Sequence, residues 1–166
     1  LEKVNSDLND TLGNFIHRAL KFIGNYYEGE VPEPKNLNKL DKHTLDCIGR
    51  TFEKVKGALD SFQLQAAARE VIELSREGNK YLNKKKPWKT VKENPQSTAN
   101  TLYVAAQIVK ALAILLEPFI PFTAEKLRNF LGIGGEARWK DAVEPLRTSQ
   151  KIKEVEPLFY KIQASE

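Results

Sequence analysis

The sequence contains one cysteine, no methionine and only two histidines in 166 residues. Cys47 can form no internal disulfide and has no cysteine partner for a zinc site, which fits a reducing compartment. His17 and His43 are not spaced to share a metal ion, so we interpret both as exposed helix residues. Because the chain lacks an initiator methionine, we expect it to be a piece of a longer protein.

A long uncharged apolar run is also missing. The opening LEKVNSDLND is too polar for a signal peptide, and the most apolar stretch, 102–122, is interrupted by Gln107, Lys110, Glu117 and two prolines. We therefore predict a soluble cytoplasmic protein. At 166 residues and 41% hydrophobic, the chain is long enough for one domain, residues 1–166, that buries roughly 70% of its unfolded surface.

Strand-like alternation is absent, and apolar residues recur at intervals of three and four nearly throughout. This periodicity predicts an all-α fold, a bundle of about five main helices. The fourth is apolar almost all round, which favours a central position. The predicted helices span residues 4–27, 41–59, 62–82 and 97–116, with a short fifth helix capped by Thr123 and stopped by Gly132.

The helical pattern weakens from Gly132 onward, where GIGGEARW and EPLRTSQK are typical of irregular connections. Pro157 is well placed to open a short last helix that runs through Ile162. We treat residues 131–166 as a tail that packs either back on the bundle or toward a part of the parent protein outside this chain.

Residues for catalysis are hard to find. The glycines of GIGGEA follow no strand and precede no Lys-Ser/Thr pair, so they form no phosphate loop. The carboxylates are scattered among lysines, as on solvated helix faces. We predict no catalytic residue, no metal site and no cofactor in this chain.

Positive charge is what the sequence has in excess, with a net charge of +4 and a pI near 9.1. Between Lys80 and Lys92 there are six lysines and no acid, and Pro87 and Trp88 lie inside that run. A polyanion would be attracted to this local excess. The lysines are equally compatible with a solvated helix end that complements the helix dipole.

The first predicted helix carries a polar strip beside its apolar face. At about 100° per residue, Asn14, Arg18, Lys21 and Asn25 share this strip. Asn14 and Arg18 are one turn apart, and an amide and a guanidinium can both hydrogen-bond the edge of a nucleobase. The same spacing also fits an ordinary wet helix surface.

Trp88 also admits two interpretations. A tryptophan at a helix end commonly packs as a half-buried cap, but RNA recognition uses aromatic rings on which unstacked bases lie while basic side chains hold the phosphates. Under the second interpretation the candidate phosphate contacts are Lys21, Lys84, Lys85, Lys86 and Lys89.

Four stretches, in order, resemble the C-terminal anticodon-binding domain of methionyl-tRNA synthetase: LNDTLGNFIHRAL, NYYEGEVPE, GNKYLNKKKPWK and LAILLEPFIPFTAEKL. The resemblance covers nearly the whole chain. The LGNF-x-x-R element is shared with the synthetases for leucine, isoleucine and valine, whereas GN-x-Y…PWK points to methionine. The HRAL and LND-x-LGNF segments are similar to those of archaeal members.

The resemblance implies a helix bundle that accepts the CAU anticodon loop of methionine tRNA. It implies that Trp88 stacks on the first anticodon base, a cytosine, and that Asn14 and Arg18 hydrogen-bond to that base. The implied partners are methionine tRNA and the N-terminal catalytic domain of the same parent chain. ATP with magnesium, and zinc as a further candidate, belong to that catalytic part.

The chain departs from the family pattern in two places. Neither an HIGH-like nor a KMSKS-like signature occurs, so we expect that this chain alone cannot make methionyl-tRNA. Many relatives carry an LPAG-type stretch before the closing PLF segment, where this chain reads EPLRTSQKIKEVEPLFYKI. Two alternatives stay open: the same module of a leucine, isoleucine or valine enzyme, and a helical interaction bundle with no RNA role.

Overall fold

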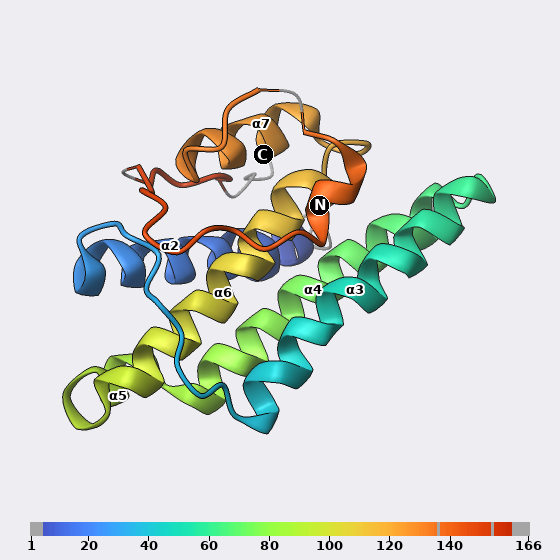
Figure 1. The fold of residues 1–166 in the computed structure, drawn as a ribbon. Coiled ribbons are helices and arrows are strands. Elements are labelled where there is room, and N and C mark those ends of the chain that lie inside the picture. The colour runs from blue at the N-terminus through green and yellow to red at the C-terminus, as the bar shows by residue number, and fades with distance from the viewer. Residues whose placement is uncertain (1–4, 136, 154, 161–166) are drawn as a thin grey trace.

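A computed structural model describes residues 5–135, 137–153 and 155–160, and nearly all of its regular structure is helical (Figure 1). The elements in chain order are the π-helix η1 (Asn5–Gly13), α2 (Asn14–Tyr27), α3 (Lys39–Asp60), α4 (Leu64–Lys85), α5 (Pro87–Glu93), α6 (Pro95–Leu115), α7 (Pro121–Phe130) and the 3-10 helix η2 (Trp139–Ala142). In the described ranges, strand-type pairing is confined to one isolated bridge, Glu30 with Lys151. The all-α prediction is confirmed.

Helix α6 lies at the centre of the molecule, as its sequence predicts. It contacts α2, α3, α4, α5, α7 and η2. By length and composition alone α6 could cross a membrane, but 94% of its most apolar window is buried inside the bundle. Its apolar character is that of a core helix, because a helix covered on all sides has no face for polar residues.

The helices α3 and α4 form a long hairpin that extends from the bundle (Figure 1). A capping box starts α3: the Asn38 side chain accepts from the Asp41 N–H at 2.9 Å, and the Asp41 carboxylate accepts from the Asn38 N–H at 3.0 Å. The α3–α4 turn places Phe62 in the left-handed region with φ of 56°. At the other end of α4, Lys86 adopts φ of 49° and joins α4 to α5.

The structure corrects two predicted helix starts and adds one helix that was not predicted. The first predicted helix is a π-helix in η1 and an α-helix only from Asn14. Over the nine residues of η1, apolar spacing of three and four does not distinguish a π-helix from an α-helix. Helix α5 was not predicted, although Pro87 at its first position is a common helix start. Thr123 is not a cap, because α7 already begins at Pro121.

The predicted last helix is wrong over Pro157 to Tyr160, where the chain is irregular, and its remainder through Ile162 lies outside the described residues. Gly132, with φ of 66°, does follow the end of α7 as predicted. Proline is compatible with a first helical turn but equally with extended chain, so Pro157 alone did not decide between them.

The described part of the tail packs back on the bundle. It crosses α6 and continues beside α2 (Figure 1). The N–H of Val31 donates to the carbonyl of Gln150 at 3.0 Å, and the N–H of Ile152 donates to the carbonyl of Gly29 at 2.7 Å. A Cβ at Gly29 would lie 2.9 Å from the Ile152 carbonyl oxygen, so only glycine allows this close approach.

Candidate nucleic-acid interface

Arg18 and Trp88, which are 70 positions apart in the sequence, meet where α5 packs against α2. The Arg18 guanidinium carbon lies 5.5 Å from the centre of the Trp88 ring, a cation–π distance. Phe22, one turn after Arg18, places its ring 6.0 Å from that of Trp88 at an interplanar angle of 36°. The prediction that Arg18 and Trp88 belong to one surface therefore has a geometric basis.

Two asparagines of α4 hold Arg18 in place. Its Nη1 donates to Asn79 Oδ1 at 3.2 Å and its Nη2 donates to Asn83 Oδ1 at 2.9 Å. Asn79 is itself fixed, since its Nδ2 donates to the carbonyl of Thr11 at 3.0 Å. Partial burial lowers the pKa of Arg18 from its usual value, but an arginine stays protonated, so the positive charge is retained.

The sequence analysis missed Asn79, Asn83 and Phe22. A signal was available, because Asn79 and Asn83 are one helical turn apart and therefore share a face of α4. Which helix that face meets was not readable from spacing. We call Arg18, Phe22, Asn79, Asn83 and Trp88 the Trp88 cluster.

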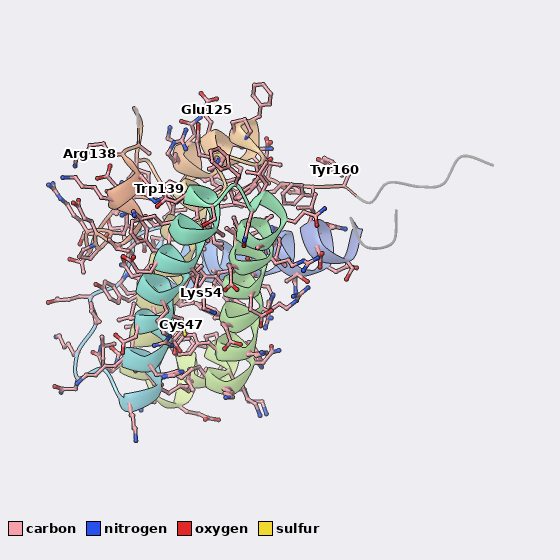
Figure 2. All side chains as sticks on the ribbon, turned by 90° about the vertical axis from the view of Figure 1, so that its right-hand side faces the viewer. Cys47, Lys54, Glu125, Arg138, Trp139 and Tyr160 are labelled. Carbon is pink, nitrogen blue, oxygen red and sulfur yellow. The ribbon has the colours of Figure 1, made fainter. Side chains whose placement is uncertain are left out.

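The Trp88 ring is packed on one side and partly exposed to solvent. It packs against Phe22 and Arg18, and the buried Pro87 anchors the start of its helix. Even so, 38% of the residue remains exposed, which is high for such a large apolar side chain. The chain's other tryptophan, Trp139, packs against Phe52 of α3 with ring centres 5.9 Å apart. Figure 2 shows Trp139 beside α3.

Asn14 is exposed at the first position of α2, one turn before Arg18. The structure confirms the shared helix face but does not bring Asn14 into contact with Trp88. Asn14 instead lines a hollow between the start of α2 and the tail residues Pro157 to Phe159.

Of the candidate phosphate contacts, four are exposed near the cluster or on α2. They are Lys21, Lys84, Lys86 and Lys89. Lys85 contradicts the prediction: its side chain is 8% exposed and its ammonium lies 2.8 Å from the fully buried carboxylate of Asp41. Successive residues of an α-helix point about 100° apart, so adjacent lysines at the end of a helix cannot all face solvent.

The two histidines differ. His43 is exposed, as predicted, but His17 is half-buried and its Nδ1 is buried with no hydrogen-bond partner. Within the ranges that the structure describes, no three His, Cys, Asp or Glu side chains gather closely enough to hold a metal ion.

A family model described as the anticodon binding domain of methionyl tRNA ligase matches residues 31–166. The chain belongs to this family. Trp88 and both asparagines of the Trp88 cluster lie inside the matched range, whereas Asn14 and Arg18 precede it.

Several methionine–tRNA ligases are similar to the chain in sequence. The chain is 40% identical to the Thermococcus kodakarensis enzyme over 97% of this chain and 22% of that protein. It is 37% identical to the Metallosphaera sedula enzyme over 96% of this chain and 28% of that protein. The chain thus spans about a quarter of the length of these relatives.

Solved structures agree in fold. The apo form of Mycobacterium tuberculosis methionyl-tRNA synthetase superposes with a TM-score of 0.92 at 26% identity, over 98% of this chain and 34% of that chain. The same enzyme in complex with methionyl-adenylate gives a TM-score of 0.90 at 25% identity, over 96% of this chain and 32% of that chain. The anticodon-binding domain fold predicted from the sequence resemblance is confirmed.

Proposed function

We propose that this domain binds the CAU anticodon loop of methionine tRNA and that Trp88 is the platform for its first base, a cytosine. The observation that carries the proposal is the Trp88 cluster, in which Arg18 lies 5.5 Å from an exposed tryptophan ring and is held by two asparagines. A ring supported from within the protein and open on its outside is suited to stacking an unpaired base.

Specificity for cytosine comes from hydrogen bonds rather than from the stack. Cytosine presents a carbonyl and a ring nitrogen that accept and an amino group that donates. A guanidinium donates only, and an amide both donates and accepts, so Arg18 and Asn14 together match this edge. A wrong base would leave one of these groups unpaired against the protein, which is unfavourable.

The exposed lysines around the cluster supply attraction that does not depend on sequence. Lys84, Lys86 and Lys89 are exposed and flank Trp88 in the sequence, and Lys21 lies on the exposed strip of α2. Each phosphate that they neutralise releases counterions, so affinity falls as salt rises.

The remaining parts of the parent protein carry the chemistry in this proposal. They attach methionine to its tRNA in the cytoplasm, with ATP and magnesium, while this domain selects the tRNA. The short sequence span relative to the ligases of Thermococcus kodakarensis and Metallosphaera sedula supports this division.

The test is a binding titration of the 166-residue chain with anticodon stem-loops reading CAU or GAU, at fixed salt. We expect the wild type to prefer CAU and Trp88→Ala to lose roughly 5- to 150-fold in affinity, the range for one base stack. Trp139→Ala is the matched control, because it removes the other tryptophan at a site distant from α5, and it should retain the CAU preference.

Equal binding of both loops by the wild type, with no effect of Trp88→Ala, would refute the proposal. The chain would then be a helical bundle with a nonspecific basic patch. A preference of the wild type for the GAU loop would also refute the proposal, because the pocket would then accept guanine rather than cytosine as the first base.

A further inference from the structure

A groove lies between α2 and the tail, beside the exposed strip of α2. Its volume is about 610 Å³. The α2–tail groove, as we call it, is lined by Lys21, Gly24 and Glu28 of α2 and by Ile152, Lys153 and Val155 of the tail. A volume of this size is sufficient for a ligand, since ligand sites commonly measure ~300–1,000 Å³.

Backbone hydrogen bonds fix the tail side of the α2–tail groove. The N–H of Ile152 donates to the carbonyl of Gly29 at 2.7 Å, just after the end of α2. The N–H of Lys153 donates to the carbonyl of Phe130 at 2.8 Å. The tail cannot move away from α2 or against it without breaking these bonds, so the groove is a preformed feature of the fold.

Both lysines of the groove are available to an anion. Lys21 and Lys153 are exposed, and neither has an ion-pair partner among the described residues. Lys151 differs, because its ammonium pairs with Glu30 at 2.9 Å. Glu28 is the only carboxylate among the described residues of the groove, so these side chains together carry a net positive charge. A phosphate has the opposite charge and accepts hydrogen bonds from ammonium groups.

Gly24 keeps the groove open on the side of α2. Glycine is less favourable than alanine within a helix. A Cβ at Gly24 would have no atom of another segment within 4 Å, so packing inside the protein does not require a glycine here. Its missing side chain leaves room for another chain to approach the helix backbone, which is a frequent use of glycine.

The groove adjoins the surface to which the proposed function assigns RNA. At about 100° per residue, Arg18 lies on one side of the exposed strip of α2, Gly24 lies on the other, and Lys21 lies between them. A helix with its side chains is only ~10–12 Å across. An RNA strand with one base on Trp88 can therefore cross α2 over a short distance and enter the groove.

We infer that the α2–tail groove binds the sugar–phosphate backbone of the same RNA strand, with Lys153 of the tail joining Lys21 as a phosphate contact. This inference rests on the proposed function and extends it from base contacts on α2 to a backbone contact shared with the tail. Phosphates are the same in every nucleotide, so the groove adds affinity without selecting a sequence.

The test is a titration of the 166-residue chain with the CAU and GAU stem-loops over a series of salt concentrations. Lys153→Gln should weaken binding of both loops alike, on the order of 5-fold at about 0.1 M salt, and leave the CAU preference unchanged. The slope of log affinity against log salt should become shallower by about 0.7–0.9, the value for one phosphate contact. Lys151→Gln is the matched control. It makes the same charge change in the same tail but outside the groove, and it should keep the wild-type slope.

A second variant tests the groove through its shape. Gly24→Gln adds a neutral side chain on the groove side of α2, where no other segment opposes it. It should weaken binding of both loops to a degree similar to Lys153→Gln, while circular dichroism shows that the helical fold is retained. Gly49→Gln, at an equally open position in α3 outside the groove, is the control and should bind as wild type.

Three results would overturn the inference: a wild-type salt slope in Lys153→Gln, equal losses in Lys153→Gln and Lys151→Gln, or full affinity in a folded Gly24→Gln. If one of them is found while the wild type still prefers CAU over GAU, the Trp88 proposal stands and only the groove assignment fails. If the wild type does not discriminate CAU from GAU, the proposed function fails. The inference then fails with it, because the groove is assigned to the strand that stacks on Trp88.

Discussion

The carboxylate of Asp41 shows how much one buried residue can organise. Asp41 is 0% exposed. One of its carboxylate oxygens accepts a hydrogen bond from the Tyr81 hydroxyl at 2.7 Å and pairs with the Lys85 ammonium at 2.8 Å. The other oxygen completes the cap of α3. This cluster ties the start of α3 to the end of α4, directly before α5 and Trp88. It also explains why Lys85 is unavailable to a phosphate.

Asp41→Asn should destabilise the chain by about 3–5 kcal/mol, because it leaves the buried Lys85 ammonium without its counter-charge. Unfolding in urea would measure the loss. The matched control is Asp60→Asn, which removes the exposed partner of Lys56 at 3.2 Å and should change the free energy of unfolding by about 0.5 kcal/mol or less. Similar effects of the two variants would show that burial of the Asp41 pair is not decisive.

Tyr81 should make the protein less stable at high pH. Burial, followed by its hydrogen bond to Asp41, raises the pKa of Tyr81 well above its ordinary value of about 10. The folded state therefore keeps this proton when the unfolded state loses it. The stabilisation is fully present below about pH 10 and is lost as pH rises, by about 1.4 kcal/mol per pH unit.

The measurement is the free energy of unfolding of wild type and Tyr81→Phe, from about one pH unit below to about one pH unit above the unfolded tyrosine pKa of about 10. Lysine titration is common to both proteins, so the difference between their slopes isolates Tyr81. Parallel slopes would mean that the hydroxyl titrates alike in the folded and unfolded chain.

At the scale of elements, the approach of α4 to α2 determines whether Asn79 and Asn83 can reach Arg18. Gly78 lies at this crossing, and a Cβ there would be 2.5 Å from the Phe15 ring, which is fully buried. The glycine lets the two helices come close enough for the side chains of the Trp88 cluster to meet.

Gly78→Ala should destabilise the chain by about 1–3 kcal/mol through overpacking, and it should also weaken the preference for the CAU loop by shifting α4. Gly49→Ala is the matched control. Gly49 lies within α3 with nothing within 4 Å of an added Cβ, so alanine should stabilise the chain by about 0.5–1 kcal/mol. Thermal and urea unfolding would compare the variants. If Gly78→Ala leaves the free energy of unfolding unchanged, the contact between Gly78 and Phe15 does not limit how closely α4 approaches α2.

At the scale of the whole molecule, α6 holds the tail through two buried polar side chains. Gln107 accepts from the Leu146 N–H at 2.6 Å and donates to its carbonyl at 3.2 Å. Lys110 donates to the carbonyl of Glu144 at 2.5 Å, and burial lowers its pKa. Gln107 and Lys110, which interrupt the apolar run in the second half of α6, therefore bind the backbone of the tail.

Gln107→Leu should release the tail locally, because both backbone groups of Leu146 lose their partner, at about 1–3 kcal/mol for each buried group left unsatisfied. Hydrogen exchange of the Leu146 amide should accelerate while that of α6 stays slow. Gln65→Leu, on the exposed side of α4, is the control and should leave the tail protected. Unchanged exchange at Leu146 in Gln107→Leu would contradict this attachment.

Much of this architecture was readable in advance. Apolar spacing located α3, α4, α6 and the end of α2 to within a few residues, because one face of a helix recurs in the sequence with a period of 3.6. The capping signals at Thr123 and Gly132 located α7 to within two residues at each end, although Thr123 itself is not the cap. The short α5 and the irregular end of the tail were not predicted. The seven residues of α5, which begin with a proline, contain too few apolar positions to establish a period.

The sequence alone determined the all-α class, the central place of α6 and the residue types that can recognise a base, because these follow from local pattern and side-chain chemistry. Only the tertiary structure decided which residues meet. It places Arg18 in contact with Asn79, Asn83 and Trp88, and it buries the Lys85 ammonium in an ion pair with Asp41. Contacts between distant positions depend on how helices cross, and that depends on packing around α6 rather than on any single segment.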